Sequence, residues 1–231
     1  MSVEVVAMIY KSTAFAAFIR EELADCGSPV RIVGNDPTTA VARMCDAFYH
    51  DPRPEDWYLS RVYRCWNWCV QSSEAEHVCL VNSDMAFSPG WLKALTRRLD
   101  GRTLPTSRLV ECGNRLQAGE NAIQVNLGDR PSNFEREQWD ALASSASCPD
   151  TLPGGCYMPC LLNRKAFLEI GGYPEGNVAD GKVVNRVPTA CDHSYLSGDY
   201  VLFQGMAALG YRHVTACDSL VYHMQEGEMR A

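Results

Sequence analysis

The sequence predicts an α/β fold in which a central mixed, mostly parallel sheet is flanked by helices. Short apolar runs that suit buried strands alternate, along the first hundred residues, with segments whose apolar residues recur at helical intervals. The chain has 231 residues, of which 46% are apolar and 21% charged, and this lies within the range of one large globular domain. We therefore expect a single domain over residues 1–231.

The first two strands each precede a predicted helix. Val3–Tyr10 is a near-continuous apolar run, typical of a strand buried on both faces. Ser12 and Thr13 can cap a following helix. The apolar residues of that helix are Phe15, Phe18, Ile19 and Leu23. A second strand is expected at Pro29–Val33, and a second helix at Thr38–Tyr49.

The third strand, Val78–Val81, follows a predicted helix at Arg61–Gln71 and ends abruptly in the polar residues Asn82–Asp84. A helix is expected to restart at Ser88, with Pro89 in its first position. Its apolar stripe comprises Trp91, Leu92, Leu95 and Leu99. Because ligands bind at the carboxyl ends of strands in open α/β sheets, Asn82–Asp84 are candidates for a site.

The second half of the sequence is less regular. Expected strands lie within residues 109–112, 122–125 and 214–222, expected helices within 133–143 and 200–209, and a strand leading into a helix within 156–176. The segment 177–197 between the last two helices is long for a connection. Such long structured loops often form lids or binding elements, and disorder is the alternative.

Composition excludes several classes of function. The formal charge is −7, and Lys and Arg do not cluster with aromatic residues, so we expect no nucleic-acid partner. No stretch approaches ~20 consecutive apolar residues, and Glu4 interrupts the N-terminal run, so neither an integral membrane segment nor a signal peptide is expected. The eleven cysteines are dispersed and odd in number, which favours reduced thiols and a cytoplasmic location.

Cysteine spacing favours core thiols over a zinc site. Cys65 and Cys69 lie four residues apart, as do Cys156 and Cys160. Structural zinc sites usually take closer cysteine pairs with further cysteine or histidine partners. We therefore interpret these residues as small buried side chains.

Polar features at the ends of predicted elements occur in a characteristic order. Asn35–Asp36 follows the second strand, Asn82–Asp84 follows the third, Gly198–Asp199 opens a late helix, and His223 lies near the end. The segments that carry these features and their surroundings are WNWCVQSSEAEHVCLVNSD, GCYMPCLLNRKAFLEIGGY, LGYR and VYHMQEGE. Their order and spacing resemble the GT-A glycosyltransferases, especially the inverting family 2, over almost the whole chain.

The resemblance implies transfer of a sugar from a nucleotide-diphosphate donor, with a UDP-sugar as the first candidate, to an acceptor hydroxyl. Residues 1–100 would bind the donor, and residues 101–231 would bind the acceptor and carry the base. A divalent metal, Mn²⁺ or Mg²⁺, would be held by Asp84 and His223. Asp199 would be the general base, since direct displacement needs one positioned carboxylate.

Two positions depart from the family pattern. Asn82 stands where the family has a first aspartate, and we expect it to hydrogen-bond the donor ribose or sugar. Gly198 replaces an acidic residue. Simpler interpretations stay open for the three reactive candidates: Asp84 as a turn-capping residue, His223 as a buried hydrogen-bonded histidine, and Asp199 as a helix N-cap.

Further residues are assigned to the donor and the acceptor by the same resemblance. Asp36 would read the donor base, with Tyr10 or Lys11 against the nucleoside. Arg61 and Arg64 share one helical face and would reach the diphosphate, unless both are solvated. The remaining predicted contacts are Asn67 and Ser83 for the donor, and Gly154, Gly155, His193 and Tyr195 for the acceptor, which is a glycan, a protein or a small molecule.

Alternative functions remain at this stage. A retaining transferase would use the same fold, and a non-catalytic module would bind nucleotide-sugars or glycans without turnover. A sugar-phosphate nucleotidyltransferase is disfavoured because no Gly-rich phosphate loop with a basic residue follows the first strand.

Overall fold

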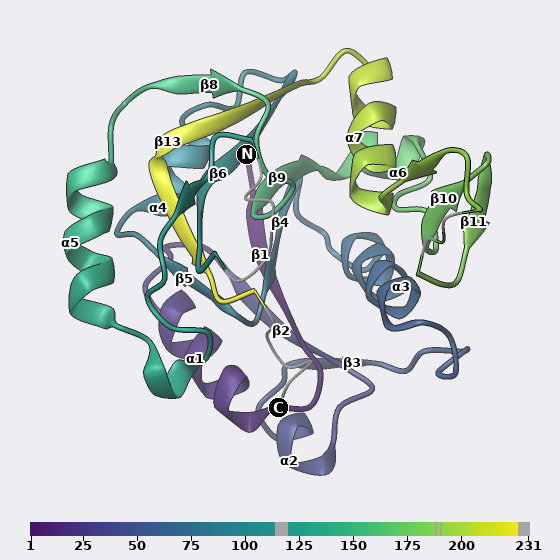
Figure 1. The fold of residues 1–231 in the computed structure, drawn as a ribbon, viewed down its shortest axis with the longest axis horizontal. Coiled ribbons are helices and arrows are strands. Elements are labelled where there is room, and N and C mark those ends of the chain that lie inside the picture. Colours follow the sequence, from purple (N-terminus) through teal and green to yellow (C-terminus); the bar gives the residue numbers. More distant parts are fainter. Residues whose placement is uncertain (114–119, 188, 190, 226–231) are drawn as a thin grey trace.

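A computed structural model of the protein describes residues 1–113, 120–187, 189 and 191–225. Within these residues a ten-stranded mixed sheet forms the centre of the molecule, with helices on both sides (Figure 1). The strand order is β3-β2-β1-β4-β9-β6-β13-β5, with β7 beside β6 and β8 beside β13. The predicted α/β class with a mostly parallel sheet is confirmed.

The strands of the central sheet are β1 (Val3–Ile9), β2 (Val30–Asn35), β3 (Ala47–Tyr49), β4 (His77–Asn82), β5 (Met85–Phe87), β6 (Thr103–Glu111), β7 (Ile123–Gln124), β8 (Thr151–Pro153), β9 (Cys160–Asn163) and β13 (Arg212–His223). The α-helices are α1 (Thr13–Leu23), α2 (Thr39–Ala42), α3 (Tyr58–Gln71), α4 (Trp91–Thr96), α5 (Arg136–Ala146), α6 (Arg164–Glu169) and α7 (Gly198–Ala208). A separate sheet contains β10 (Asn177–Ala179), β11 (Lys182–Val184) and β12 (Tyr195–Leu196).

Two groups of helices cover the sheet. In Figure 1, α1, α4 and α5 lie towards the left, and α3, α6 and α7 lie together towards the right. Ile19 of α1 and Leu95 of α4 are fully buried in the first core. Trp66 of α3, Phe167 of α6 and Met206 of α7 are buried in the second. Burial of these apolar faces is the main source of stability for such a layered fold.

The first strand and helix form as predicted, but the second helix is much shorter than expected. Ser12 caps α1 by accepting a hydrogen bond from the amide of Phe15. The helix predicted over Thr38–Tyr49 stops at Ala42, and residues 47–49 instead form β3, parallel to β2. Asp46 holds the chain here by accepting a hydrogen bond of 2.7 Å from the amide of Ile32. Pairing at the sheet edge therefore overrides helical periodicity.

The segment after Asp84 also differs from its prediction. Residues 85–87 form β5, antiparallel to β13, and the helix begins only at Trp91. Ser88 does not cap that helix, because its hydroxyl accepts a hydrogen bond from the amide of Leu220 in β13. Gly90 takes the N-cap position with φ 73°, a conformation that favours glycine. Pairing with β13, which lies far along the chain, therefore overrides the local pattern that predicted a helix starting at Ser88.

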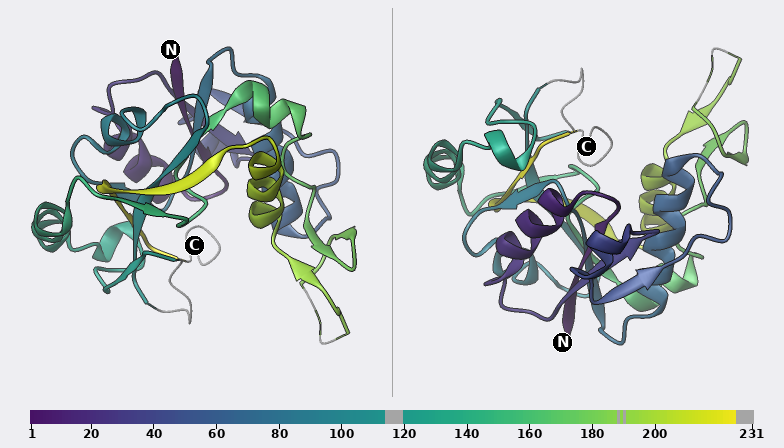
Figure 2. Two further views of the ribbon diagram at one scale, coloured as in Figure 1. Left: turned by 90° about the horizontal axis from the view of Figure 1, so that it is seen from above. Right: turned by 90° about the horizontal axis from the view of Figure 1, so that it is seen from below.

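The described residues of segment 177–197 include the small sheet β11-β10-β12. Figure 2 shows this sheet projecting from the body of the molecule beside α7.

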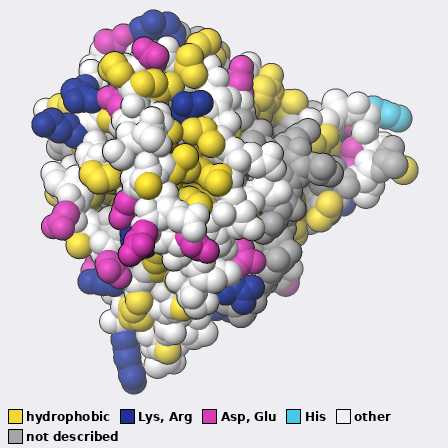
Figure 3. Space-filling view, turned by 60° about the vertical axis from the view of Figure 1, so that its left-hand side comes forward, with side chains coloured by type: hydrophobic (Ala, Val, Ile, Leu, Met, Phe, Trp, Pro, Cys, Tyr) yellow, Lys and Arg dark blue, Asp and Glu magenta, His cyan; other side chains and the backbone are white. Residues whose placement is uncertain are grey.

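On the face seen in Figure 3, Lys and Arg side chains are scattered among Asp and Glu. Across the described residues, none of the helices is both long and apolar enough to span a membrane.

Asn67 joins α3 to the chain after α6. Its side-chain amide donates to the carbonyl of Tyr173 at 2.9 Å, and its carbonyl accepts from the amide of Tyr173 at 2.8 Å. Gly172 must lack a side chain here, because a Cβ atom would lie 2.5 Å from Asn67 Oδ1. Two sequence motifs that are a hundred residues apart therefore meet in one contact.

We expect Asn67→Ala to lower the free energy of unfolding by about 1–3 kcal/mol, since it leaves two buried backbone groups without partners. Chemical denaturation would measure this loss. The control is Glu137→Ala on the exposed face of α5, which should change stability by at most about 0.5 kcal/mol. Equal effects of the two variants would contradict the bridging role of Asn67.

Candidate active site

A cavity of about 500 Å³ opens at the carboxyl ends of the central strands. It is lined by Leu59, Val62, Tyr63, Trp66, Asn82, Met85, Leu109, Glu111, Glu120, Gly155, Cys156, Tyr157, Met158, Asp199 and His223. Both halves of the sequence contribute. The predicted residues Asn82, Asp199, Gly155 and His223 therefore share one cavity.

Glu111 and His223 line the cavity and form a cluster of three ionisable side chains with Asp84, which is buried beside His223 and does not itself line the cavity. The Nε2 atom of His223 lies 3.3 Å from Asp84 Oδ2, and its Nδ1 atom lies 3.4 Å from Glu111 Oε1. Strand register brings them together: in β13, His223 pairs with Glu111 of β6 on one side and with Met85 of β5 on the other. The turn that carries Asp84 is tied to β13 by a 3.0 Å hydrogen bond from the amide of Met224 to the carbonyl of Asp84.

The two carboxylates control the charge of His223. Burial by itself lowers the pKa of this histidine, but the negative charges and hydrogen bonds of Asp84 and Glu111 outweigh burial and raise the pKa to about 10. Glu111 Oε2 is buried and receives no hydrogen bond from the described residues. A buried carboxylate oxygen without a donor is costly, and a cation supplied from solution would satisfy it.

The donor set of this cluster fits a divalent cation that completes its shell with ligand oxygens. Across the residues that the structure describes, no three His, Cys, Asp or Glu side chains form a ready metal cage. Mg²⁺ and Mn²⁺ sites that act on phosphates commonly use only one or two protein carboxylates together with phosphate and water oxygens. Asp84 and Glu111 offer such carboxylate oxygens. His223, which the same two carboxylates keep protonated near neutral pH, would add a nitrogen ligand only by giving up its proton.

Asp199 lies at another part of the cavity wall, in the first turn of α7. It is not the N-cap, because Ser197 holds that position and accepts a hydrogen bond from the amide of Tyr200. Burial raises the pKa of Asp199 to about 6, although a hydrogen bond from Tyr63 opposes the shift. A carboxylate with a pKa near neutrality in a cavity suits proton transfer.

Four predicted donor residues gather at the carboxyl ends of β1 and β2. The guanidinium of Arg61 donates to Tyr10 Oη at 2.7 Å and to Asp36 Oδ2 at 2.6 Å. Lys11 Nζ lies 4.6 Å from the centre of the Tyr10 ring. Asp36 has φ 47°, a left-handed conformation that aspartate tolerates. The structure therefore joins Tyr10, Lys11, Asp36 and Arg61 into one cluster.

Two other predicted donor residues, Arg64 and Asn67, have hydrogen-bond partners away from this cluster. Arg64 is buried and donates two hydrogen bonds to Asp51 Oδ1 and a further one to Asp56 Oδ2 at 2.8 Å. Asn67 bridges α3 to Tyr173. Arg64 and Asn67 do not line the cavity, and neither do the four residues of the Arg61 cluster. The remaining donor candidate, Ser83, is buried next to Asp84.

The two predicted acceptor glycines are required by the packing of the loop before β9. Gly154 has φ 68° and Gly155 has φ 129°. A Cβ atom on Gly155 would lie 2.0 Å from Thr215 Oγ1, and that hydroxyl donates to the carbonyl of Gly154 at 2.7 Å. The loop can therefore sit directly on β13, which exposes the Gly155 backbone to the cavity.

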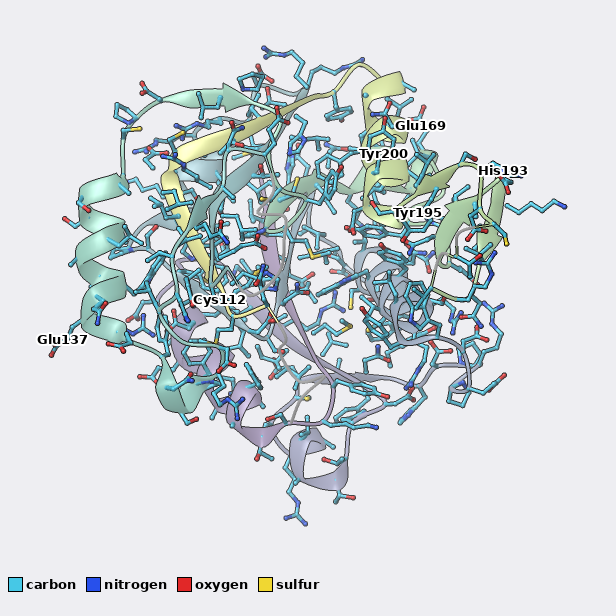
Figure 4. All side chains as sticks on the ribbon, viewed as in Figure 1. Cys112, Glu137, Glu169, His193, Tyr195 and Tyr200 are labelled. Carbon is cyan, nitrogen blue, oxygen red and sulfur yellow. The ribbon has the colours of Figure 1, made fainter. Side chains whose placement is uncertain are left out.

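The acceptor candidates of segment 177–197 lie apart from each other. Figure 4 shows His193 at the outer edge of the small sheet and Tyr195 closer to α7. The hydroxyl of Tyr195 accepts a hydrogen bond from Asn177, whose own carbonyl accepts one from the amide of Gly198. Tyr195 is thus linked through the side chain of Asn177 to the helix that carries Asp199. His193 is exposed, and neither residue lines the cavity.

Sequence reasoning missed Glu111 and Tyr63. Glu111 closes a strand that was expected near residues 109–112, so an acidic residue at a strand end was the available signal. Tyr63 lies within an apolar helical pattern and gave none. Its role depends on a partner in α7, more than a hundred residues away.

Solved structures resemble this chain in fold. The chain superposes on the crystal structure of S. aureus TarS 1–349 with a TM-score of 0.56 and 12% identity, covering 96% of this chain and 60% of that one. GalNAc-T7 with UDP, GalNAc and Mn²⁺ gives a TM-score of 0.58 and 9% identity, covering 96% of this chain and 44% of that one. The fold is of GT-A type. This confirms the resemblance predicted from the sequence.

The similarity is structural, since identity is low. A crystal structure of S. aureus TarS also matches, with a TM-score of 0.56 and 12% identity over 96% of this chain and 36% of that one. No protein-family profile and no curated protein matches the sequence. The chain spans between about a third and three fifths of the length of these GT-A neighbours.

We expect Arg64→Met to lower the free energy of unfolding by about 3–5 kcal/mol, because it leaves the buried Asp51 carboxylate without its partner. Arg97→Met is the control. Arg97 pairs with Asp218 but is largely exposed, so its loss should cost at most about 1 kcal/mol. A small effect of Arg64→Met in chemical denaturation would instead indicate a side chain available to ligands.

Proposed function

We propose that the protein is a metal-dependent glycosyltransferase that moves a sugar from a nucleotide-diphosphate donor, a UDP-sugar in the first instance, to an acceptor hydroxyl with inversion. One observation carries this proposal: a single cavity contains both a cation-compatible cluster at His223 and a carboxylate, Asp199, whose pKa is raised towards neutrality. Leaving-group stabilisation and proton removal are the two demands of this reaction.

The donor would lie along the carboxyl ends of β1, β2 and β4. The cluster of Tyr10, Lys11, Asp36 and Arg61 offers a ring face, two cations and a carboxylate to the nucleoside and diphosphate. Asn82 lines the cavity and would hydrogen-bond the ribose or sugar. Asp84 and His223 would hold Mn²⁺ or Mg²⁺, which supplies Lewis-acid stabilisation of the diphosphate charge when bound.

Asp199 would act as the general base. The acceptor oxygen forms a bond to the anomeric carbon while the bond from that carbon to the diphosphate oxygen breaks. The hydroxyl proton passes to the Asp199 carboxylate, and the diphosphate leaves with the bonding electron pair. Direct displacement from the face opposite the leaving group inverts the anomeric centre and requires one base, which matches one carboxylate at this position.

The acceptor would approach between the loop at Gly154–Gly155 and the small sheet β11-β10-β12. Tyr195 and Tyr200 expose ring surface beside α7, and aromatic rings offer apolar faces with a polar edge. We include His193 as an outer contact for a large acceptor. Glycan, protein and small-molecule acceptors are all compatible with this surface.

Three further parts of the proposal rest on independent observations. GalNAc-T7, which shares the fold, was crystallised with UDP, GalNAc and Mn²⁺. A cytoplasmic location is supported by the eleven cysteines, which all have free thiols. We treat residues 1–231 as one domain because the donor cluster and Asp199 come from different halves of the chain but serve one sheet edge.

A true donor should stabilise the protein in a metal-dependent way. At about 100 times its dissociation constant a ligand adds about 2.7 kcal/mol, which corresponds to a Tm increase of about 5–10 °C for a domain of this size. We expect this increase with one of UDP-, GDP- or dTDP-sugars plus Mn²⁺ or Mg²⁺, and its loss in Asp84→Asn. Asp218→Asn is the matched control, since Asp218 is similarly buried but pairs with Arg97 and Arg98 outside the cavity.

Activity should follow the ionisation of Asp199. Because its pKa is raised to about 6, the carboxylate is protonated below that pH, and the rate should increase as the pH rises through about 6. Asp199→Asn should lower kcat by about 10²- to 10⁴-fold while donor binding persists.

The raised pKa of Asp199 also makes folding stability decrease as the pH rises from about 4 to about 6, since the folded state holds this proton more tightly than the unfolded state.

Two outcomes would redirect the proposal. Retention of the anomeric configuration in the product would indicate a retaining enzyme on the same fold. Donor binding without turnover for any acceptor, with Asp199→Asn indistinguishable from the natural sequence, would indicate a nucleotide-sugar-binding module.

A further inference from the structure

Asp199 has a neighbour that no motif assigns. The hydroxyl of Tyr63, in the middle of α3, donates a hydrogen bond of 3.0 Å to Asp199 Oδ2. Tyr63 is 1% exposed, and both residues line the cavity. The contact joins α3 to α7 through two residues that lie 136 positions apart in the sequence.

The Tyr63 ring is held firmly in place. It stacks on Tyr173 with a centroid distance of 5.0 Å and an interplanar angle of 10°. Tyr173 is in turn fixed by its two backbone hydrogen bonds with Asn67, which lies one helical turn after Tyr63 on α3. A rigid donor of this kind restricts the carboxylate that it contacts.

Gly198 is explained by the same tyrosine. A Cβ atom at this position would lie 2.4 Å from Tyr63 Cε2 and 2.6 Å from Cζ, and 2.9 Å from the backbone oxygen of Gly176, distances that real contacts do not reach; the contacts with Tyr63 are the closest. Backbone conformation does not require glycine here, because Gly198 has a helical conformation and does not have a positive φ. The ring therefore occupies the volume into which any side chain at position 198 would project.

We propose that Tyr63 is the positioning residue for Asp199: its hydroxyl orients the carboxylate into the cavity, and its ring takes the place of a side chain at position 198. This inference rests on the proposed function, in which Asp199 is the base. Asn177 supports the other side of the same helix end by accepting a 3.0 Å hydrogen bond from the amide of Gly198. The entrance of α7 is thus fixed from two directions.

The test is the pH dependence of Tyr63→Phe, which keeps the ring and its stacking but removes the hydroxyl. A hydrogen bond to an ionised group is worth about 1.5–3 kcal/mol, so the acidic limb of kcat should move up by roughly one to two pH units. The variant should be impaired near pH 6 and recover at higher pH. A purely structural defect would lower the rate at every pH without moving the limb.

Four tyrosines lie close enough to Asp199 for its negative charge to act on them: Tyr63, Tyr157, Tyr173 and Tyr195. Burial, the largest cause, and this charge raise the pKa of each, so none of these four loses its proton near pH 6. The other ionisable groups that line the cavity are Glu111, Glu120 and His223. The matched control is Tyr49→Phe, which also removes a tyrosine hydroxyl. Tyr49 lies in β3 outside the cavity, and its ring packs against Trp68 of α3, the helix that carries Tyr63. Its pH profile should equal that of the natural sequence.

A titration by NMR separates this inference from the proposed function. With ¹³C-labelled aspartate, and the Asp199 signal assigned through Asp199→Asn, the carboxyl midpoint should rise in Tyr63→Phe even if no transferase activity is found. An unchanged midpoint and an unchanged acidic limb would overturn the inference. As a second variant, Gly198→Ala should be destabilising alone but markedly less so when combined with Tyr63→Leu.

Discussion

The register of β13 is the constraint on which the candidate site depends. This strand pairs in parallel with β6 and antiparallel with β5, and both pairings place His223 next to acidic residues: Glu111 is its partner in β6, and Asp84 precedes its partner Met85 in β5. Because side chains alternate between the faces of a sheet, a slip of one residue would turn His223 away from both carboxylates.

An irregularity in the middle of β13 allows the strand to serve two neighbours. Its pairing with β6 shifts between Ala216 and Leu220. Before the shift it pairs with β8, which leads into the Gly154–Gly155 loop, and after the shift it pairs with β5, which follows Asp84. Bulged strands often redirect side chains near active sites. One strand thus aligns the Gly154–Gly155 loop with the turn that carries Asp84.

Charge is distributed unequally within the cavity. Two carboxylates face one histidine, His223, and raise its pKa to about 10. His223 contacts Oε1 of Glu111, and Glu111 Oε2 has no hydrogen-bond donor among the described residues. At Asp199, burial outweighs the hydrogen bond from Tyr63 and raises the pKa of the carboxyl to about 6. The buried carboxyl of Asp199 costs stability, whereas the ion pairs of His223 contribute to it; a strongly shifted pKa in a cavity is typical of functional sites.

The sequence by itself determined the α/β class, the first strand and helix, and the positions of Asp84, Asp199 and His223 at element ends, because periodicity and capping are local properties. It could not determine that residues 47–49 and 85–87 are strands, since their pairing with β2 and β13 overrides the local pattern. It could not distinguish Arg61, which pairs with Asp36 and Tyr10, from Arg64, which pairs with buried Asp51. Only tertiary structure placed Glu111 beside His223 and Tyr63 beside Asp199, because each of these contacts joins residues more than a hundred positions apart.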